Sequence, residues 1–433
     1  MTSSSCSEEA ALSFPAISGQ EAEHSSAKRP KMDDNSAPST SVLPDVPTSA
    51  GVCRLPKGHK YAMLLSYSGK DYLGMQFNGD FPTIEKDLFT ALSRLHLIPK
   101  PDEGQKFLEP AKFRFQRAAR TDKGVSAVRQ ICSVWLRVSD AEEELRRLTQ
   151  RIREQLPNQQ IGLMGLRRAT KGFDAKQACD ARTYSYTMPS YAFAHVDELT
   201  SESFRLPEGR LTEVNGILSI FCGTHNFFNF TSRKEHTEKS CIRYILRCEC
   251  DPPVVLDGLE FVTVHLKGQS FMMHQIRKMI GLCISIVRGF VDKSIIQRAW
   301  ESKRLDVPRA PGLGLLLEKC HYEVYDKKFG KIHPSIDHWA ECEDAVEEHK
   351  KRWILPTIVD GEKNGCSMLS WLNTLHLHSF DYDDSSIETG QAQAVSLLKE
   401  LSDDKEHVPN SNPAEAEKTF TGLGRIDNEK KCL

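Results

Sequence analysis

A repeated order of strand and helix patterns constrains the fold of this 433-residue chain more than any other feature. The first copy opens with a β-rich segment at 60–69, followed by a helical pattern from Thr83 to about Leu97. In that helical pattern apolar residues recur every three or four positions, which is the period of an amphipathic helix. Two strands, a charged helix and a fourth strand follow, at 113–119, 128–138, 140–155 and 161–168. The first copy therefore has the order β-α-β-β-α-β.

The second copy follows the same order more loosely. Its strands are expected at 182–188, 242–250, 259–267 and 313–324, and its helices at 210–222, 271–288 and 292–302. We predict an α+β fold of two pseudo-repeated ferredoxin-like halves, 53–175 and 176–330, which together form one extended, mainly antiparallel sheet. Helices on one face would leave a basic catalytic cleft over the other. A helical segment at about 336–350 and Trp371-Leu372 predict a C-terminal helical extension over 331–380 that packs against this core.

Polar composition marks both ends of the chain. Residues 1–52 are rich in Ser, Ala, Pro and Glu, and 381–433 are equally polar, so both segments are expected to be disordered tails. Residues 1–50 carry a net charge of −4 and residues 378–433 of −6, which leaves +8 on the central part of a chain whose total is −2. A basic core between acidic tails favours a polyanionic partner, although surface charge also varies this much without any function.

Several classes of protein are disfavoured. No apolar run reaches the length of a membrane span, and the N-terminus lacks the features of a secretory signal or a mitochondrial presequence. The chain has 13 cysteines and no Cys-x-x-Cys pair, so we expect buried thiols rather than disulfides or a zinc site. Cys248 and Cys250 would lie on one face of a strand. We therefore expect an intracellular protein without a bound metal.

The segment Arg117–Ala127 is the strongest candidate for chemistry. A predicted strand ends in Arg120-Thr121-Asp122, and Gly124 permits a tight turn directly after it. Such a turn can present a carboxylate at a strand end, next to basic side chains that favour its ionised form. The alternative is an ordinary Asp-containing turn with solvated Arg and Lys, which is the commoner arrangement. Physical reasoning on this segment alone does not favour the functional interpretation.

The same segment resembles the catalytic motif of the TruA-type tRNA pseudouridine synthases, in which Arg-Thr-Asp precedes Lys or Ala and then Gly-Val. Other motifs of that family have similar segments here, in the same order, over roughly residues 60–325. They are Tyr67-Ser68-Gly69 with Gly74-Met75-Gln76, Asp180–Tyr186, Thr224–Thr231, Gln269–Met279 and Pro311–Leu317. The first motif departs from the family pattern at Ser68 and Met75, substitutions associated with the eukaryotic branch.

The resemblance implies an enzyme that isomerises uridine to pseudouridine in RNA without a metal or other cofactor. It assigns Asp122 as the catalytic carboxylate, Tyr184 as the tyrosine against the uracil and Arg277 as the partner of Asp122. Without the resemblance, Tyr184 would be a half-buried strand residue and Arg277 a residue of a helix surface. Whether Asp122 attacks C1′ or removes the 2′ proton stays open. The expected RNA contacts are Arg120, Lys123, Arg182 and Tyr184, with Arg117, Arg129, Lys171, Lys176, Arg233 and Lys234 along the RNA path.

The resemblance also implies a substrate and leaves rival functions to be tested. The eukaryotic branch modifies the anticodon stem of tRNA, with mRNA and small nuclear RNA as further candidate substrates. A catalytically silent RNA-binding or tRNA-folding protein on the same scaffold is the alternative, and a glycosidase would need a second carboxylate. Lys28-Arg29-Pro30-Lys31 is compatible with nuclear import, and the cytoplasm and mitochondria are further candidate locations. The sequence leaves monomer and homodimer equally open.

Overall fold

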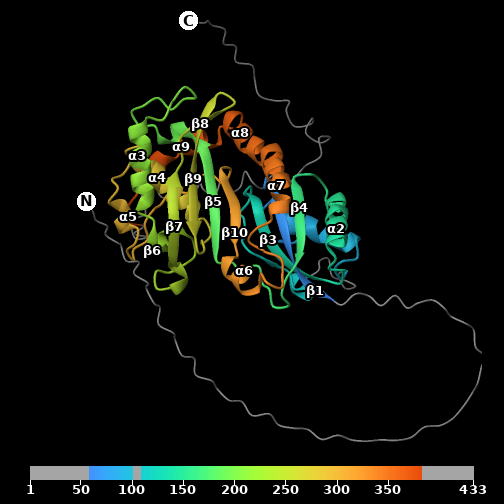
Figure 1. Cartoon of the computed structure of the whole chain (residues 1–433). Coiled ribbons are helices and arrows are strands. Elements are labelled where there is room, and N and C mark those ends of the chain that lie inside the picture. The colour runs from blue at the N-terminus through green and yellow to red at the C-terminus, as the bar shows by residue number, and fades with distance from the viewer. Residues whose placement is uncertain (1–57, 101–108, 383–433) are drawn as a thin grey trace, which may run out of the picture. The chain divides into compact units, whose positions relative to one another are not determined.

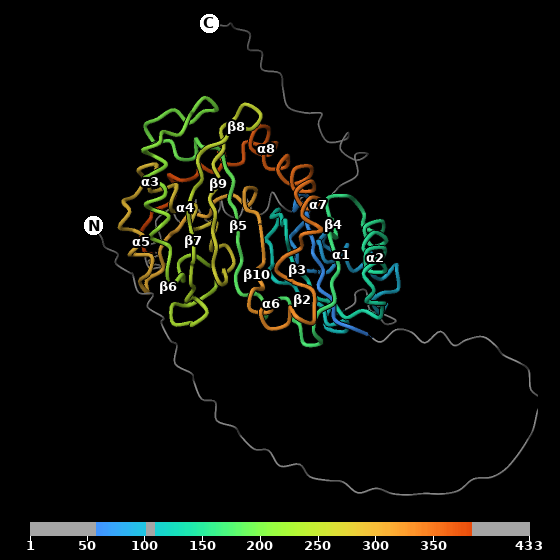
Figure 2. Tube along the Cα trace, in the orientation of Figure 1, coloured from blue at the N-terminus to red at the C-terminus, as the bar shows by residue number. Residues whose placement is uncertain are grey.

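The computed structural model describes residues 58–100 and 109–382 (Figures 1 and 2). The predicted tail 1–52, its basic cluster and residues 383–433 lie outside the described residues. The structure confirms an α+β fold built on one large, mixed, mainly antiparallel sheet. No helix of the described part is long and apolar enough to cross a membrane.

The first half has the predicted order of elements. They are β1 (His59–Tyr67), α1 (Ile84–Arg94), β2 (Gln116–Arg117), β3 (Ser126–Leu136), α2 (Glu142–Gln155) and β4 (Ile161–Arg168). The expected strand 113–119 is wrong in its extent, because the chain forms a 3-10 turn at Pro110–Phe113 and only two residues of strand. Arg114 ends that turn in the left-handed region (φ 48°), which breaks the extended conformation. A loop therefore separates β2 from β3 and carries Asp122.

The second half also follows the expected order and adds two short strands. Its elements are β5 (Ala181–Pro189), α3 (Glu208–Ser219), β6 (Gly223–Asn226), β7 (Ile242–Cys250), β8 (Val254–Leu256), β9 (Leu259–Gly268), α4 (Gln275–Val287), α5 (Ile295–Arg298) and β10 (Leu315–His321). The added strands are β6 and β8, which have only four and three residues. Strands this short carry too few alternating positions to be recognised from sequence.

The sheet runs β4-β1-β3-β10-β5-β9-β7-β6, with β2 paired to β3 and β8 to β9. Every pairing is antiparallel except that of β3 with β10, which runs parallel through Ser126–Ala127 and Leu316–Leu317. Because two parallel strands begin at the same edge of a sheet, the loops that precede β3 and β10 lie next to each other. The loop before β3 carries Asp122. The junction of the two halves is therefore where segments distant in the sequence meet.

The two faces of the sheet are covered differently. Arg117 of β2 pairs with Glu85 of α1, so α1 covers the face of the sheet to which Arg117 points. Cys283 of α4 lies close to the buried Cys248 and Cys250 of β7, so α4 covers the face to which these cysteines point. The strand pairing places these side chains on the same face, so α1 and α4 both pack on it. As expected for core thiols, these three cysteines are buried. The opposite face of the first half is not left open. Trp339 lies over it, in contact with Gly165.

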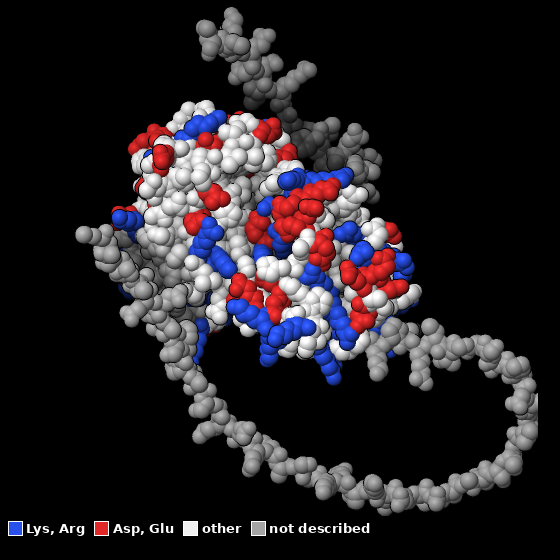
Figure 3. All heavy atoms as spheres, viewed as in Figure 1, with Lys and Arg blue, Asp and Glu red and all other residues white. Residues whose placement is uncertain are grey.

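The C-terminal extension supplies this second cover. It comprises α6 (Glu323–Phe329), α7 (Glu343–His349), a π-helical segment (Lys350–Ile354), α8 (Leu355–Lys363) and α9 (Ser367–Leu372). Helix α7 contacts β1, β3 and β4, and α8 contacts β5 (Figure 1). The segment contains these helices and contacts the sheet, and the helix expected at 336–350 begins only at Glu343. Acidic side chains gather on the outer side of α7 (Figure 3).

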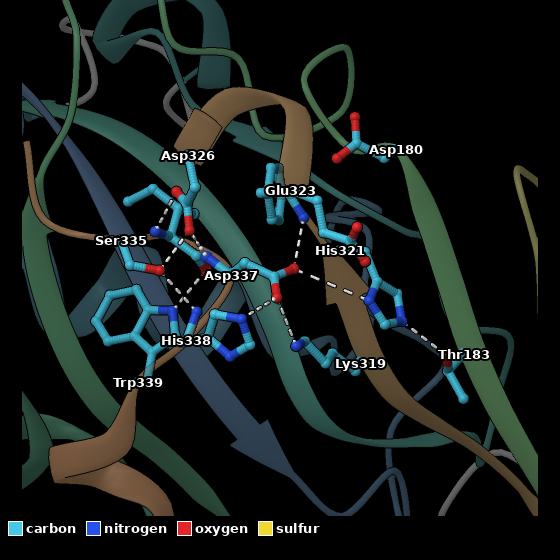
Figure 4. Close-up of polar contacts among 12 residues, drawn as sticks. Asp180, Thr183, Lys319, His321, Glu323, Asp326, Ser335, Asp337, His338 and Trp339 are labelled. Atoms are coloured by element: carbon cyan, nitrogen blue, oxygen red, sulfur yellow. Dashed lines mark hydrogen bonds and ion pairs between the residues drawn. The ribbon is translucent and has the colours of Figure 1, made fainter. Parts of the chain in front are cut away.

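A buried carboxylate fastens the extension to the sheet. Asp337 accepts hydrogen bonds from Lys319 Nζ of β10 and from the backbone N–H of Tyr322, each at 2.7 Å (Figure 4). Next to Lys319, His321 Nε2 lies 2.8 Å from Thr183 Oγ1 of β5. Burial alone would raise the pKa of Asp337, but these two hydrogen bonds outweigh burial and hold the pKa below its ordinary value. The carboxylate therefore stays ionised and links the extension to β10.

Candidate active site

Asp122 opens a tight turn directly before β3. The Val125 N–H donates to Asp122 O (3.1 Å), and Gly124 between them has φ 73°, a conformation that glycine adopts without a side-chain clash. The sequence-based expectation of a glycine-dependent turn is thus confirmed. The side chains of Asp122 and Lys123 reach solvent, and that of Asp122 is 30% exposed. The turn presents a carboxylate outward from a fixed backbone.

The first motif holds this turn in place. The Met75 N–H donates to Thr121 O (3.1 Å), and the Gly124 N–H donates to Tyr72 O (3.1 Å). Gly74, at φ 105°, approaches so closely that a Cβ there would lie 2.8 Å from Thr121 O. An alanine at Gly74 would therefore push the catalytic loop away. The glycine of this motif serves close backbone contact rather than chemistry.

Tyr67 contacts the residue directly before Asp122 and so holds the turn against the sheet. Its hydroxyl lies 2.9 Å from Thr121 Oγ1, one residue before Asp122, and the tyrosine side chain is fully buried. Tyr67 pairs with Ala127 across β1 and β3, Ala127 with Leu317, and Leu317 with Tyr184. Paired residues point to the same face of a sheet, so Tyr67 and Tyr184 belong to one row of side chains beneath the loop.

Tyr184 is a buried aromatic residue in the row of side chains beneath the turn. The residue is 7% exposed, and its ring packs edge-on against Phe271 with centroids 5.3 Å apart. Among the described residues the hydroxyl makes no hydrogen bond, and it is not fully enclosed. Burial raises the pKa of Tyr184 above its ordinary value, so the phenol stays neutral. A ring held in this way can stack against a base and offer one hydrogen bond.

The start of α4 brings two more side chains to the turn. His274, the residue before the helix, adopts a left-handed conformation (φ 65°), and its Nε2 lies 3.8 Å from Asp122 Oδ2. Arg277 follows one helical turn later, where its Nε donates to Ala310 O (2.7 Å). A Cβ at Gly312 would lie 3.4 Å from Lys123 O and 3.6 Å from the Arg277 guanidinium carbon.

Gly312 is therefore the narrow spacer between the catalytic turn and the Arg277 guanidinium. Burial lowers the pKa of His274, and among the charged groups Asp122 opposes this shift while Arg277 reinforces it. Asp122, His274 and Arg277 thus share one electrostatic environment. The predicted direct pairing of Arg277 with Asp122 stays a prediction, whereas their proximity is a feature of the fold.

Residues of the Thr224–Thr231 motif, together with Lys278, support the start of α4. Thr231 Oγ1 donates to Met273 O (2.9 Å), and Lys278 Nζ donates to Asn229 O (3.0 Å). Asn229 is itself buried and donates to Ala299 O (3.1 Å). Asn229 is thus a core residue. The motif holds the helix end that presents His274.

Arg182 is engaged within the protein. The residue is 9% exposed, and its guanidinium donates to Ala118 O (2.9 Å), Gln269 O (2.7 Å) and Lys176 O (3.3 Å). These carbonyls belong to the segment before Asp122, the segment before α4 and the loop before β5. Arg182 therefore joins three loops of the site, and its predicted contact with RNA stays a prediction.

Two further arginines of the predicted RNA path are engaged within the protein. Arg117 forms a two-pronged ion pair with the buried Glu85, whose carboxylate also accepts from the Phe77 N–H (2.8 Å). Arg129 pairs with Glu343 and Glu347 of α7, on the face opposite to α1. Both guanidinium groups are engaged in ion pairs within the protein, and their predicted contact with RNA stays a prediction.

The other predicted RNA contacts lie at the surface. They are Arg120, Lys123, Lys171, Lys176 and Arg233, all exposed, and Lys234, which pairs with Glu238. Arg120 NH1 donates to Gln76 Oε1 at 3.4 Å, a long hydrogen bond that leaves most of the guanidinium in solvent. Its position two residues before Asp122 is compatible with the predicted role.

Sequence reasoning did not single out His274, Arg309 or Tyr67 as individual site residues. His274 was part of a quoted motif, and its spacing of three residues from Arg277 on a helix was the available signal. Arg309, whose NH1 lies 3.4 Å from His274 Nε2, offered no such signal. It lies in the loop before β10, which reaches the site only through the pairing of β10 with β3.

Comparison with known proteins identifies the family of the chain. Residues 217–323 match the family model described as tRNA pseudouridine synthase. The chain is 47% identical over 335 residues to "Pseudouridylate synthase 1 homolog" of Mus musculus, covering 76% of each chain, and 46% identical over 326 residues to that of Homo sapiens, covering 73% of each. It is 27% identical over 396 residues to "tRNA pseudouridine synthase 1" of Saccharomyces cerevisiae, covering 73% of this chain and 69% of that one. The chain belongs to the TruA family of tRNA pseudouridine synthases, which are isomerases.

Proposed function

We propose that this enzyme isomerises uridine in the anticodon stem region of tRNA, with Asp122 as its catalytic carboxylate. The observation that carries the assignment of Asp122 is its position on a rigid turn at the junction of the two halves. There His274 and Arg277 approach from α4, and Tyr184 lies in the row of side chains beneath. Asp122 is the carboxylate among the charged groups of the described residues that most affect His274. The identical strand order in each half, β4-β1-β3-β2 and β10-β5-β9-β7, supports two pseudo-repeated ferredoxin-like halves.

The proposed chemistry needs one carboxylate and a means of holding the base. The N1–C1′ bond of uridine breaks, the uracil turns, C5 bonds to C1′, and the proton lost from C5 is matched by one gained at N1. Asp122 acts on the sugar as nucleophile or base. Tyr184 stacks against the detached uracil, and Arg277 keeps the carboxylate ionised and oriented. Arg120 enters the stack from which the uridine has moved, and Lys123 contacts the RNA backbone.

The substrate range and the location are part of the proposal. Relatives that modify tRNA by name support a tRNA substrate, and exposed basic residues on both sides of Asp122 support a basic cleft for the RNA. Messenger RNA and small nuclear RNA are further candidate substrates. We propose a nuclear enzyme, with the cytoplasm and mitochondria as further sites of action. Mapping pseudouridine in cellular RNA with and without this protein tests both substrates and sites.

Asp122→Asn tests the catalytic assignment. Asn keeps the size of the side chain and most of its hydrogen bonding, so the turn and tRNA binding should survive while the nucleophile or base is lost. We expect no pseudouridine in a single-turnover assay, with tRNA affinity close to that of the unchanged enzyme. A rate within about tenfold of the unchanged enzyme, or about 1.4 kcal/mol in barrier, would refute the mechanism. Joint loss of binding and activity would indicate that Asp122 is a structural turn residue.

A further inference from the structure

We propose that His274 is a positioning residue: its neutral imidazole donates a hydrogen bond to Asp122 and orients the carboxylate toward the sugar. The proposal rests on the catalytic role of Asp122 proposed above. His274 Nε2 lies 3.8 Å from Asp122 Oδ2, and the imidazole is 17% exposed while the carboxylate is 30% exposed.

Arg309 contacts both ring nitrogens of His274 at the long limit of hydrogen-bond length. Its NH1 lies 3.5 Å from Nδ1 and 3.4 Å from Nε2 of His274. The lone pairs of an imidazole point outward in the ring plane and in different directions, so a donor aligned with one nitrogen is much farther from the other. Nearly equal distances therefore place the guanidinium against the ring face, as in a cation–π contact. Arg309 therefore contacts the two nitrogens from outside the ring plane.

The surroundings of His274 keep the ring neutral. Burial lowers its pKa most, Asp122 opposes the shift, and Arg309, Arg277 and Lys278 add to it, giving a value of about 4. These groups come from the turn before β3, the loop before β10 and α4 itself. At neutral pH the ring therefore carries one N–H and one lone pair. A carboxylate next to Nε2 selects the tautomer with the proton on Nε2.

The arrangement leaves one carboxylate oxygen for the substrate. Asp122 Oδ2 faces His274, so a hydrogen bond there would fix the rotation of the side chain and leave Oδ1 for the sugar. The present 3.8 Å exceeds hydrogen-bond length, and the bond forms when bound RNA excludes water, since catalytic contacts commonly tighten in the complex. His274 has a left-handed backbone at the start of α4, and its ring faces Asp122 of the turn. That conformation costs free energy and is often retained where it serves a site.

A matched pair of variants tests the hydrogen bond. His274→Gln places an amide N–H where Nε2 stood, whereas His274→Leu is similar in size and has no donor; both carry the same left-handed strain. We expect Gln to stay within about threefold of the unchanged single-turnover rate and Leu to fall about 10- to 100-fold, the effect of losing one hydrogen bond to a charged group. Affinity for tRNA should be the same in both. Equal losses in Gln and Leu, or a Leu variant within about threefold of the unchanged rate, would overturn the proposal.

His274→Asn covers the case in which Leu does not fold. Asn tolerates the left-handed region well, but its amide reaches only the position of Nδ1. We expect it to behave as Leu does, and activity close to that of Gln would overturn the assignment of Nε2. Asp122→Asn, assayed in parallel, keeps the two proposals distinct. If Asp122→Asn turns over normally, the role of Asp122 fails; if it is inactive while His274→Leu is not, only the present proposal fails.

Two measurements separate positioning from proton transfer. In RNA carrying 5-fluorouridine, C5 has no proton to lose, so product formation reports only bond cleavage and rejoining. A positioning residue predicts that Leu slows this reaction as much as it slows pseudouridine formation. If His274 instead removed the C5 proton, the Leu variant would process the fluorinated RNA as fast as the unchanged enzyme does. That result would overturn the proposal. The second measurement is the pH dependence of the rate. Because the ring stays neutral, the rate of the unchanged enzyme should not fall below pH 6.5, the ordinary pKa of histidine, in a way that the Gln variant lacks.

Discussion

Glu362 in the C-terminal extension provides a quantitative test of the structure. Glu362 lies on α8 and is 3% exposed, and its Oε2 accepts a hydrogen bond from the Met368 N–H (2.8 Å). Among the described residues Glu362 forms no ion pair. Burial raises the pKa of this carboxyl from its ordinary 4.5 to about 7, although the Met368 hydrogen bond opposes the shift. Glu362→Gln removes the charge and retains the acceptor.

The sign and size of the effect follow from linkage. A carboxyl whose pKa is raised by folding disfavours the ionised form, so its cost is absent in acid and grows as pH rises above 4.5. The cost is complete above a pH of about 7, where the difference in pKa corresponds to about 3 kcal/mol. We therefore expect Glu362→Gln to raise the free energy of unfolding by about 3 kcal/mol at about pH 8 and by less than about 1 kcal/mol at about pH 5.

Urea unfolding at these two pH values measures the difference directly. The matched control is Glu348→Gln on α7, where the side chain is exposed and the same change should have little effect at either pH. Equal stability of Glu362→Gln and the unchanged protein at about pH 8 would show that water or a counter-ion reaches this carboxylate. The burial of α8 against the sheet would then be wrong.

The remaining predictions concern the site. Arg182→Lys keeps the charge but cannot span the carbonyls of Ala118 and Gln269, so the single-turnover rate should fall at least about tenfold with tRNA affinity nearly unchanged. Arg277→Met should lower the chemical step with RNA binding retained, and an active variant would show that another cation orients Asp122. Neutralising Lys171, Lys176 and Arg233 together should lower the slope of log affinity against log salt by up to about 3, and an unchanged slope would place the RNA elsewhere.

Periodicity was sufficient to predict most of the fold. The order of six elements in the first half follows from alternating apolar residues, and the turn at Gly124 follows from glycine after Asp122. The parallel pairing of β3 with β10 could not be predicted in this way, because strand patterns do not specify partners. The adjacency of Asp122 to Gly312 depends on that pairing, so the site itself follows from topology and not from spacing.

Arginine roles were the least predictable part of the site. Arg117, Arg129 and Arg182 stand close to the motifs in sequence, which suggested RNA contact, yet each is bound to carboxylates or carbonyls of the protein. Sequence does not show whether a guanidinium meets solvent or a buried acceptor, because the acceptor comes from a distant element. Glu85, which lies 32 residues before Arg117, is such an acceptor.

Several of the motif residues hold the turn that carries Asp122 in place. Gly74 fits against Thr121, Tyr67 binds Thr121, and Arg182 joins the loops on both sides, so a change at any of them displaces Asp122. Loss of activity in such variants therefore does not identify a catalytic group. When Asp122 is only displaced, the reaction rate falls with the displacement, and a conservative replacement at the supporting residue restores it. When the carboxylate itself is removed, no such replacement restores the rate. Pairs such as His274→Gln and His274→Leu distinguish these cases because they differ only in one donor.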